Sequence, residues 1–225
     1  MEKYCINLNK SPERFDKMKE LYSKIVRIEA FDGNTLEKYS NIKYPRNTKQ
    51  NKYELACCLS HIKAIVTAYK NNLNGVLILE DDISNEYTDK LEEKMTEIVS
   101  KSPPNCDCIQ LFTSNPWMFK RFINSQHMFI QWAKYFWGAC CYYINRKGMR
   151  KIYNMFYKDG VYILPPNLQN YVADEIIYKY INTCYYPKPL FINLLQPSTI
   201  HNHKEERSVE NTIHCLIKQY FESQS

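Results

Sequence analysis

The sequence predicts an α/β fold, in which a Rossmann-like, mostly parallel sheet is flanked by helices. One observation is the apolar run over residues 76–79, whose composition is typical of a strand covered on both faces. A second is that the run continues directly into Glu80, Asp81 and Asp82, at the carboxyl end where open α/β sheets place their ligands. A third is that short apolar runs alternate with segments of helical periodicity along the chain.

The length and composition favour one domain over residues 1–225. A chain of 225 residues that is 44% hydrophobic can bury a substantial core. The stretch of lowest polarity, residues 135–144, is too short to cross a membrane. No basic segment followed by an apolar segment opens the chain. We therefore expect a soluble cytoplasmic protein without a transmembrane segment, and nothing in the sequence indicates its oligomeric state.

Charge and cysteine content exclude several classes of protein. The net charge of +6 is spread as lysines among polar residues, which usually indicates solvated helix faces. It favours an anionic ligand such as a nucleotide diphosphate, whereas the absence of an Arg-rich block argues against nucleic acid. The cysteine count of nine is odd and several lie in apolar patterns, as reduced thiols do. Cys106 and Cys108 have no partner pair at zinc spacing.

The first predicted unit is a strand over residues 4–8 that leads into a helix. Ser11 as N-cap with Pro12 at the first helical position is a strong start signal. A loop between a strand and a helix amino end offers backbone N–H groups to a phosphate. Arg14 in the first turn would add its guanidinium to the same phosphate, or it is simply solvated.

The next segments contain two further candidate positions. A strand over residues 26–31 is expected to end in a turn at Asp32 and Gly33. The polar segment 34–52 is predicted to be a mobile loop. The helix expected over residues 54–69 carries Ser60 and His61, and a helical histidine beside an apolar face is often a satisfied core residue instead of a ligand.

The second half of the chain continues the alternation. After a helix over residues 87–99, we expect strands over residues 108–112, 138–144 and 190–195, and helices over residues 147–156, 174–181 and 209–220. Asp174 should lie at or next to its helix N-cap. The aromatic region 117–137 has poor periodicity, so it forms either acceptor-binding loops or a subsidiary apolar cluster.

The three consecutive carboxylates are the main chemical signal. Two like charges about 4 Å apart repel by roughly 4 kcal/mol at an effective dielectric near 20, so they must point into water or share a cation. Carboxylate oxygens at a strand end suit Mn²⁺ or Mg²⁺. The alternative is a solvated acidic turn in which Asp82 or Ser84 caps the following helix.

Several short blocks, in order, resemble glycosyltransferase family 25. They are INL (6–8), SPER (11–14), AFDG (30–33), ELAC (54–57), SH (60–61), LILEDD (77–82), GACCYY (138–143) and KG (147–148). The family includes bacterial lipooligosaccharide galactosyltransferases and the collagen galactosyltransferases of animals and large DNA viruses, so a viral source is one hypothesis. Relatives usually carry glycine where this chain has Ala56, and the resemblance fades near Asp174.

The resemblance implies a GT-A fold, a UDP-sugar donor and Mn²⁺ at a DxD-like acidic motif. It assigns nucleotide or donor contacts to a set of residues spread over the first 81 positions. These are Asn7, Leu8, Asn9, Arg14, Asp32, Gly33, Ser60, His61 and Asp81. It also implies an inverting transfer with a β-linked product.

The remaining roles are hypotheses that go with this reaction. Asp82 and Glu80 are the predicted metal ligands, with His201 or His203 as a third. Asp174, or else Glu175, is the predicted base that takes the proton of the acceptor hydroxyl.

The predicted function is therefore transfer of a hexose, galactose or glucose, from a UDP-sugar to a hydroxyl of a glycan or protein. A non-catalytic module that binds a sugar nucleotide or glycan is the main alternative. A metal-dependent phosphohydrolase is a third, less favoured because further carboxylates or histidines at the necessary positions are not found.

Overall fold

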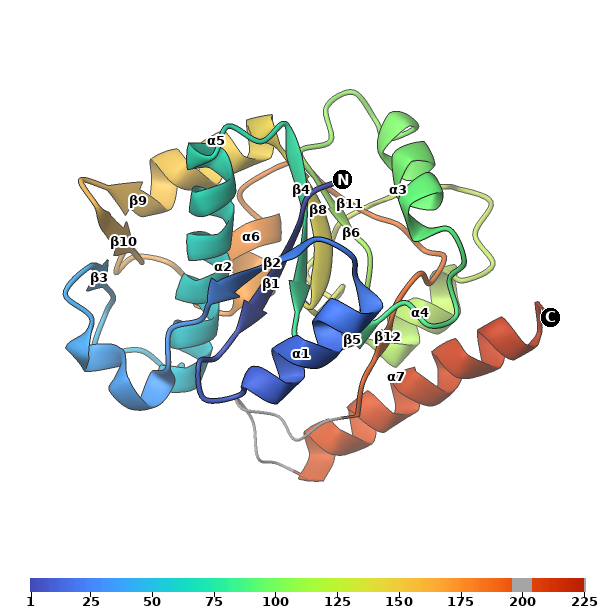
Figure 1. Cartoon of the computed structure of the whole chain (residues 1–225), viewed down its shortest axis with the longest axis horizontal. Helices are drawn as coiled ribbons and strands as arrows, with labels where there is room; N and C mark the ends of the chain where they lie inside the picture. The colour runs from blue at the N-terminus through green and yellow to red at the C-terminus, as the bar shows by residue number, and fades with distance from the viewer. Residues whose placement is uncertain (196–203, 225) are drawn as a thin grey trace.

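The computed structural model describes residues 1–195 and 204–224, apart from the side chains of 204–207. A seven-stranded sheet stands between two layers of helices (Figure 1). Its strand order is β2-β1-β4-β8-β6-β11-β7. Strands β2, β1, β4, β6 and β11 run in one direction, and β8 and β7 run in the other. The predicted α/β class with a mostly parallel sheet is confirmed.

The strands of this sheet are short. They are β1 (Lys3–Asn7), β2 (Ile25–Glu29), β4 (Gly75–Glu80), β6 (Cys108–Gln110), β7 (Ile130–Gln131), β8 (Cys141–Asn145) and β11 (Thr183–Tyr185). Two smaller sheets flank it. One joins β3 (Ile42–Lys43), β10 (Val161–Ile163) and β9 (Tyr157–Lys158), and the other joins β12 (Ile192–Asn193) and β5 (Ile83–Ser84).

The helices form one layer on each face. On one face lie α2 (Lys52–Lys70), α5 (Arg146–Phe156) and α6 (Ala173–Tyr178), whose apolar residues share one core cluster. On the other lie α1 (Pro12–Leu21), α3 (Leu91–Ser100) and α7 (Lys204–Glu222), which share a second cluster with α4 (Pro116–Phe122). No described helix is long and apolar enough to cross a membrane.

Strand β4 is the centre of the sheet, as its composition predicts. It pairs in parallel with β1 and antiparallel with β8. Its alternate residues serve both cores, because Val76 and Ile78 pack under α2 and α5 while Leu77 and Leu79 pack under α1 and α3. Burial on both faces therefore explains why the run is continuously apolar instead of alternating.

Helix α2 is the longest element of the first layer and has a complete capping box. The Asn51 side chain accepts from the backbone N–H of Glu54, and the Glu54 carboxylate accepts from the backbone N–H of Asn51. The helix continues to Lys70. A nearly continuous face of it, from Leu55 to Ala68, is buried. His61 lies on this buried face with no exposed surface.

The structure corrects two expectations and decides between the alternatives of a third. The segment 34–52 is not an unstructured loop, because a 3₁₀ helix, η1 (Gly33–Lys38), and strand β3 lie within it, and β3 pairs with β10. Asp174 is in the first turn of α6, whose N-cap is Val172. For region 117–137 the alternative of a subsidiary apolar cluster is confirmed, since Met118 and Phe136 pack with Tyr185, and helix α4 and strand β7 supply much of its backbone. Strands β3 and β7 pair with segments that are distant in the chain, so local sequence patterns do not predict them.

Helix α5 packs so closely on the sheet that its Gly148 has no room for a side chain. A Cβ at this position would lie 2.8 Å from the Asp107 carbonyl oxygen and 2.9 Å from an Ile144 side-chain carbon. We expect Gly148→Ala to lower the free energy of unfolding by about 1–3 kcal/mol through overpacking, as measured by urea denaturation. Arg150→Ala, on the exposed side of the same helix, should change it by less than about 0.5 kcal/mol, and equal effects would contradict the prediction.

Candidate functional site

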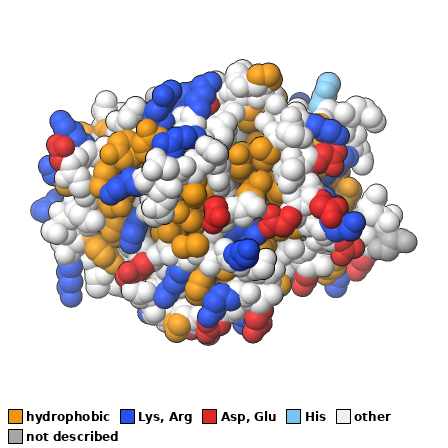
Figure 2. Space-filling model, turned by 45° about the horizontal axis from the view of Figure 1, so that its top comes forward, with side chains coloured by type: hydrophobic (Ala, Val, Ile, Leu, Met, Phe, Trp, Pro, Cys, Tyr) orange, Lys and Arg blue, Asp and Glu red, His pale blue; other side chains and the backbone are white. Residues whose placement is uncertain are grey.

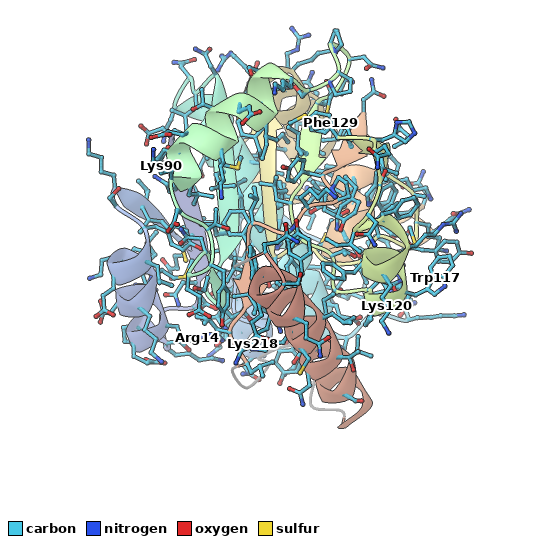
Figure 3. All side chains as sticks on the ribbon, turned by 90° about the vertical axis from the view of Figure 1, so that its right-hand side faces the viewer. Arg14, Lys90, Trp117, Lys120, Phe129 and Lys218 are labelled. Carbon is cyan, nitrogen blue, oxygen red and sulfur yellow. The ribbon has the colours of Figure 1, made fainter. Side chains whose placement is uncertain are left out.

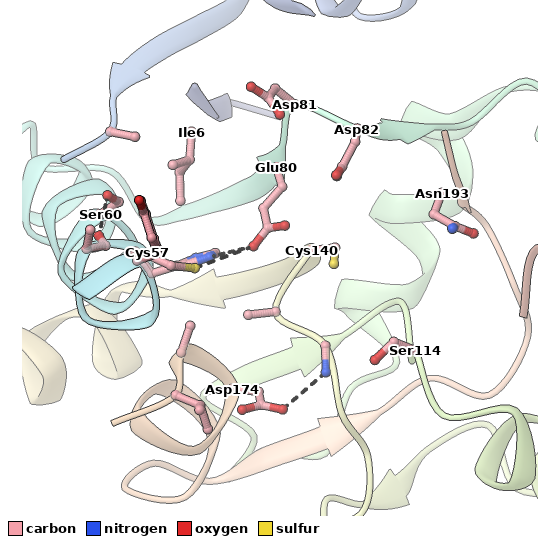
Figure 4. Close-up of a pocket in the computed structure, with 18 of the residues that line it drawn as sticks. Ile6, Cys57, Ser60, Glu80, Asp81, Asp82, Ser114, Cys140, Asp174 and Asn193 are labelled. Atoms are coloured by element: carbon pink, nitrogen blue, oxygen red, sulfur yellow. Dashed lines mark hydrogen bonds and ion pairs between the residues drawn. The ribbon is translucent and has the colours of Figure 1, made fainter. Parts of the chain in front are cut away.

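A pocket of about 600 Å³ opens at the carboxyl ends of β1 and β4, a volume typical of small-molecule sites. It brings together most of the residues singled out by the sequence. Its lining includes Asn7, Leu8, Arg14, Asp32, Gly33, Ser60, His61, Glu80, Asp81, Asp82, Asp174 and Glu175. Figure 4 shows Glu80 and Asp82 on one side of this space and Asp174 on the other.

Glu80 faces helix α2. Its Oε1 accepts from His61 Nε2 at 3.0 Å and lies 4.0 Å from the Cys57 Sγ. Since a carboxylate only accepts, His61 Nε2 carries a proton, and its Nδ1 lies 3.1 Å from the Tyr142 hydroxyl. Burial acts to raise the pKa of Glu80, but its interactions with His61, Cys140 and Arg14 together outweigh burial, and the pKa is lowered. Glu80 is therefore an ionised, oriented carboxylate.

In Figure 4 the Asp81 side chain points away from Glu80 and Asp82, and its partner Arg14 belongs to helix α1. Its carboxylate accepts from Asn7 Nδ2 at 2.6 Å and pairs with Arg14 at 2.6 Å. The same Asn7 amide also donates to the Ser11 carbonyl at 2.9 Å, which fixes the loop before α1. Asp81 therefore connects the acidic motif to the β1–α1 loop.

Asp82 is the least compensated of the three carboxylates. Its Oδ2 lies 3.2 Å from Arg14, but its Oδ1 is buried without a hydrogen-bond partner among the described residues. Burial, and then the negative charge of Glu80, raise the pKa of Asp82, although Arg14 opposes them. Asn193 of β12 also lines the pocket, and its buried Oδ1 has no hydrogen-bond partner in the part of the chain that the structure describes. Strand β12 is held there by the Leu194 N–H, which donates to the Asp82 carbonyl at 2.6 Å.

These oxygen atoms fit a hard divalent cation. Buried acceptors that lack a donor are costly, and the oxygens of Asp82 and Asn193 are of the kind that Mn²⁺ and Mg²⁺ prefer. Glu80 adds a neighbouring carboxylate to these oxygen atoms. A second arrangement, Cys57, His61 and Glu80, has ligand atoms within 4.8 Å of one another. Burial, and then the charge of Glu80, raise the pKa of the Cys57 thiol well above its usual value, which disfavours the thiolate that a metal requires.

Across the pocket, Asp174 and Glu175 differ in their surroundings. Asp174 accepts from the Gly138 N–H at 3.2 Å and from the Glu175 N–H at 2.8 Å, and burial raises its pKa. Glu175 accepts from Asn170 Nδ2 at 3.2 Å and lies 3.8 Å from Lys134 Nζ. Asp174 therefore has no basic partner among these contacts, whereas Glu175 has one.

Two other predicted positions, Asp32 and Ser60, line the pocket but already have hydrogen-bond partners. Asp32 accepts from the Asn34 N–H and from Lys10 at 2.9 Å each, and these contacts outweigh burial and lower its pKa. The Ser60 hydroxyl is already engaged, since it accepts from the Phe31 N–H at 2.9 Å and donates to the Ala56 carbonyl at 2.6 Å.

Three further predicted positions lie away from the pocket or outside the described part of the chain. Asn9 is not among the pocket residues, and its amide donates to Glu29. His201 and His203 fall outside the described residues.

Sequence reasoning gave no role to several residues of the pocket, among them Asn193, Cys140 and Lys134. Asn193 belongs to a predicted strand, but its pairing with β5 is needed to bring it beside Asp82. Cys140 and Lys134 lie in the loop that precedes β8, and only the position of β8 next to β4 places that loop over the pocket. Cys140 lies in the GACCYY block and Lys134 in the aromatic region, but neither pattern gives the residue a role.

The match of the chain to a family model identifies its class, and the protein is a glycosyltransferase. It belongs to glycosyltransferase family 25, described as an LPS biosynthesis protein family, whose model matches residues 1–164. The matched region contains the acidic motif and helix α2 but ends before Asp174. No curated protein sequence matches the chain.

Solved structures include distant likenesses. A glycosyltransferase involved in the glycosylation of the major capsid of PBCV-1 is 13% identical, with a TM-score of 0.47 over 94% of this chain and 98% of that one. The apo form of mouse xyloside xylosyltransferase 1 is 12% identical, with a TM-score of 0.33 over 66% of this chain and 55% of that one. At these TM-scores the family assignment rests on the sequence match.

Proposed function

We propose that the chain is a single-domain, metal-dependent inverting glycosyltransferase that moves a hexose from a UDP-sugar to a hydroxyl of a glycan or protein. The observation that carries the proposal is the buried Asp82 oxygen, which has no donor within residues 1–195 and 204–224 as described and which faces the same pocket as Asp174. A cation on one side and a base on the other are the two requirements of such a transfer.

The nucleotide would lie at the end of β1 and β2. Asn7, Leu8, Asp32 and Gly33 line this part of the pocket. Tyr53 of α2 packs so closely on Gly33 that a Cβ there would lie 2.6 Å from its ring, so the wall is narrow and well defined. We propose that the base and ribose occupy this region.

The acidic motif would hold the cation. Asp82, with Glu80 and Asn193 beside it, supplies the oxygen ligands, and Arg14 balances part of their charge at 2.6 Å from Asp81 and 3.2 Å from Asp82. When bound, the cation would neutralise the negative charge that develops on the departing diphosphate. His61 fixes the orientation of Glu80 at 3.0 Å, which makes it a positioning residue.

Asp174 would act as the general base. It lies across the pocket from the acidic motif, and the N–H groups of Gly138 and Glu175 orient its carboxylate. One base and direct displacement by the acceptor hydroxyl would give inversion at the anomeric carbon. The side-chain contacts of Glu175 with Lys134 and Asn170 favour Asp174 over Glu175 for this role.

Release of UDP tests the proposal against its alternatives. The protein is incubated with UDP-galactose, UDP-glucose or UDP-N-acetylglucosamine and Mn²⁺, with and without a mixture of acceptor glycosides. Release of UDP that depends on the metal and the sugar is expected. Binding of UDP without turnover by any donor would instead favour a non-catalytic module, and release of inorganic phosphate would indicate a hydrolase.

The raised pKa of Asp174 predicts the acidic side of the pH profile. A base must be ionised, so kcat/KM falls as the pH is lowered through its pKa. Because burial raises that pKa above the ordinary 3.8, the loss should begin at higher pH than for an exposed aspartate. Steady-state rates at saturating Mn²⁺ measure the profile, and a limb at the ordinary aspartate value would contradict the assignment.

A further inference from the structure

The loop before β8 presents aromatic side chains to solvent at the edge of the pocket. Phe136 is 1% exposed and packs with Met118 and Tyr185 in a small apolar cluster. Its neighbours turn outward, since Tyr135 is 61% and Trp137 is 47% exposed. Of these two, only Trp137 lines the pocket. The aromatic residues of this loop therefore have two environments. Phe136 is packed in the apolar cluster, and the ring of Trp137 is exposed beside the pocket.

The loop is held in place by polar contacts to its backbone. The Gln110 side-chain amide lies 2.8–3.2 Å from four carbonyl oxygens, those of residues 112, 136, 137 and 138. The Ser114 N–H donates to the Trp137 carbonyl at 3.0 Å, and Asn115 Nδ2 donates to the Tyr135 carbonyl at 2.9 Å. The exposed ring of Trp137 is therefore carried by a preorganised backbone, which lowers the cost of ordering it on binding.

The loop also adjoins the proposed base. Gly138 follows Trp137, donates its N–H to Asp174 at 3.2 Å, and has a left-handed φ of +102°. A Cβ at Gly138 would lie 3.2 Å from the Ser114 nitrogen, so both the conformation and the space favour glycine. One short turn thus links the aromatic ring to the carboxylate that would deprotonate an acceptor.

We propose that Trp137 forms the acceptor subsite, where the pyranose ring of a saccharide acceptor stacks on the indole and presents its hydroxyl to Asp174. This inference rests on the proposed transferase function and specifies its acceptor as a glycan. The C–H face of a pyranose is a flat apolar surface that suits an exposed indole. Lys134 and Glu175, 3.8 Å apart at the same wall, offer a donor and an acceptor to ring hydroxyls.

The same wall disfavours a hydroxylysine side chain of a protein. Such an acceptor has no flat apolar face next to its hydroxyl for the exposed indole of Trp137 to contact. A saccharide has such a face. Trp117 provides the comparison, because it is 58% exposed but carries Arg121 over its ring at 5.1 Å and does not line the pocket. Figure 3 shows Trp117 at the periphery of the molecule, on the other side of α7 from Arg14.

The kinetic test compares Trp137→Ala with Trp117→Ala. UDP release is measured without acceptor, with methyl pyranosides of galactose, glucose and N-acetylglucosamine, and with a hydroxylysine peptide. Trp137→Ala should raise KM for the preferred methyl pyranoside by about tenfold, the order expected for one aromatic contact. Trp137→Tyr should bring KM most of the way back to the wild-type value, and Trp117→Ala should match the wild type both in KM and in acceptor-independent UDP release.

The outcomes separate this inference from the function on which it rests. Normal KM in Trp137→Ala, or transfer to the peptide and to no pyranoside, would overturn the inference while the transferase function stands. If no donor is turned over, the function fails, and saturation-transfer NMR with the same methyl pyranosides, in the presence of UDP and Mn²⁺, decides the subsite separately. Saturation of the sugar protons that Trp137→Ala abolishes would support it, and no saturation in the wild type would refute it.

Discussion

Asp82→Asn is expected to lower metal-dependent sugar transfer by about a hundred- to a thousand-fold. Neutralising the charge of a leaving group is worth several kcal/mol, and each loss of about 1.4 kcal/mol lowers a rate tenfold. Asp82 supplies the buried oxygen that has no hydrogen-bond partner among the described residues, so the amide should weaken metal binding more than it disturbs packing. Initial rates of UDP release over a range of Mn²⁺ concentrations measure the effect.

A direct measurement of the ion separates binding from catalysis. Free Mn²⁺ is followed by electron paramagnetic resonance in titrations of the wild type and of Asp82→Asn, and the variant should leave more ion free. Asp89→Asn is the matched control, since Asp89 is an exposed acid in the segment that follows the motif. Unchanged affinity for Mn²⁺ in Asp82→Asn would remove this residue from the proposed ligands.

Asp174→Asn should reduce turnover by about 10²–10⁴-fold, the usual contribution of a general base. The amide keeps the size of the side chain but cannot take a proton. Glu175→Gln is the comparison, because Glu175 is the adjacent carboxylate and the other predicted base. If Glu175→Gln abolishes transfer and Asp174→Asn does not, the two roles are reversed.

The free energy of unfolding of Asp174→Asn shows whether its loss of activity comes from the missing carboxylate or from loss of the folded state. The folded-state pKa of Asp174 is raised by burial, so its contribution to stability is complete below the unfolded-state pKa and is lost as the pH rises through the folded-state value. At neutral pH the amide relieves this charge burial but accepts one of the two backbone N–H bonds poorly. We expect the free energy of unfolding to change by no more than about 1 kcal/mol, and unfolding of the variant would make its activity uninformative.

The elements that the sequence predicts well are those with a strong local signal. The strand at 76–79 and the helices that begin near Ser11 and residue 147 were predicted from apolar periodicity and capping residues alone. Their burial follows from the same pattern, because each presents its apolar residues to one of two cores. The distribution of charged residues predicted less about the structure than the apolar pattern did. Basic and acidic side chains are interspersed on the face shown in Figure 2, so no region stands out by sign.

A strand that the sequence missed, and the order of the strands in the sheet, depend on distant partners. The strand predicted over residues 138–144 is β8, which lies antiparallel between β4 and β6, and β11, a strand that was not predicted, pairs with β6 across more than 70 residues of chain. Residue patterns at 141–145 and 183–185 are compatible with a strand, but neither contains information about its neighbour. The loop with Trp137 is placed over the pocket by this arrangement.

The sequence by itself determined which segments form the central strands and helices, and that three carboxylates follow the central strand, because backbone preference and apolar periodicity act between near neighbours. Only the tertiary structure decided how the three differ. His61 orients Glu80, Asn7 and Arg14 engage Asp81, and Asp82 keeps a buried oxygen without a partner among the described residues. The charge and availability of a carboxylate depend on burial and on the side chains beside it, and those come from segments far away in the chain.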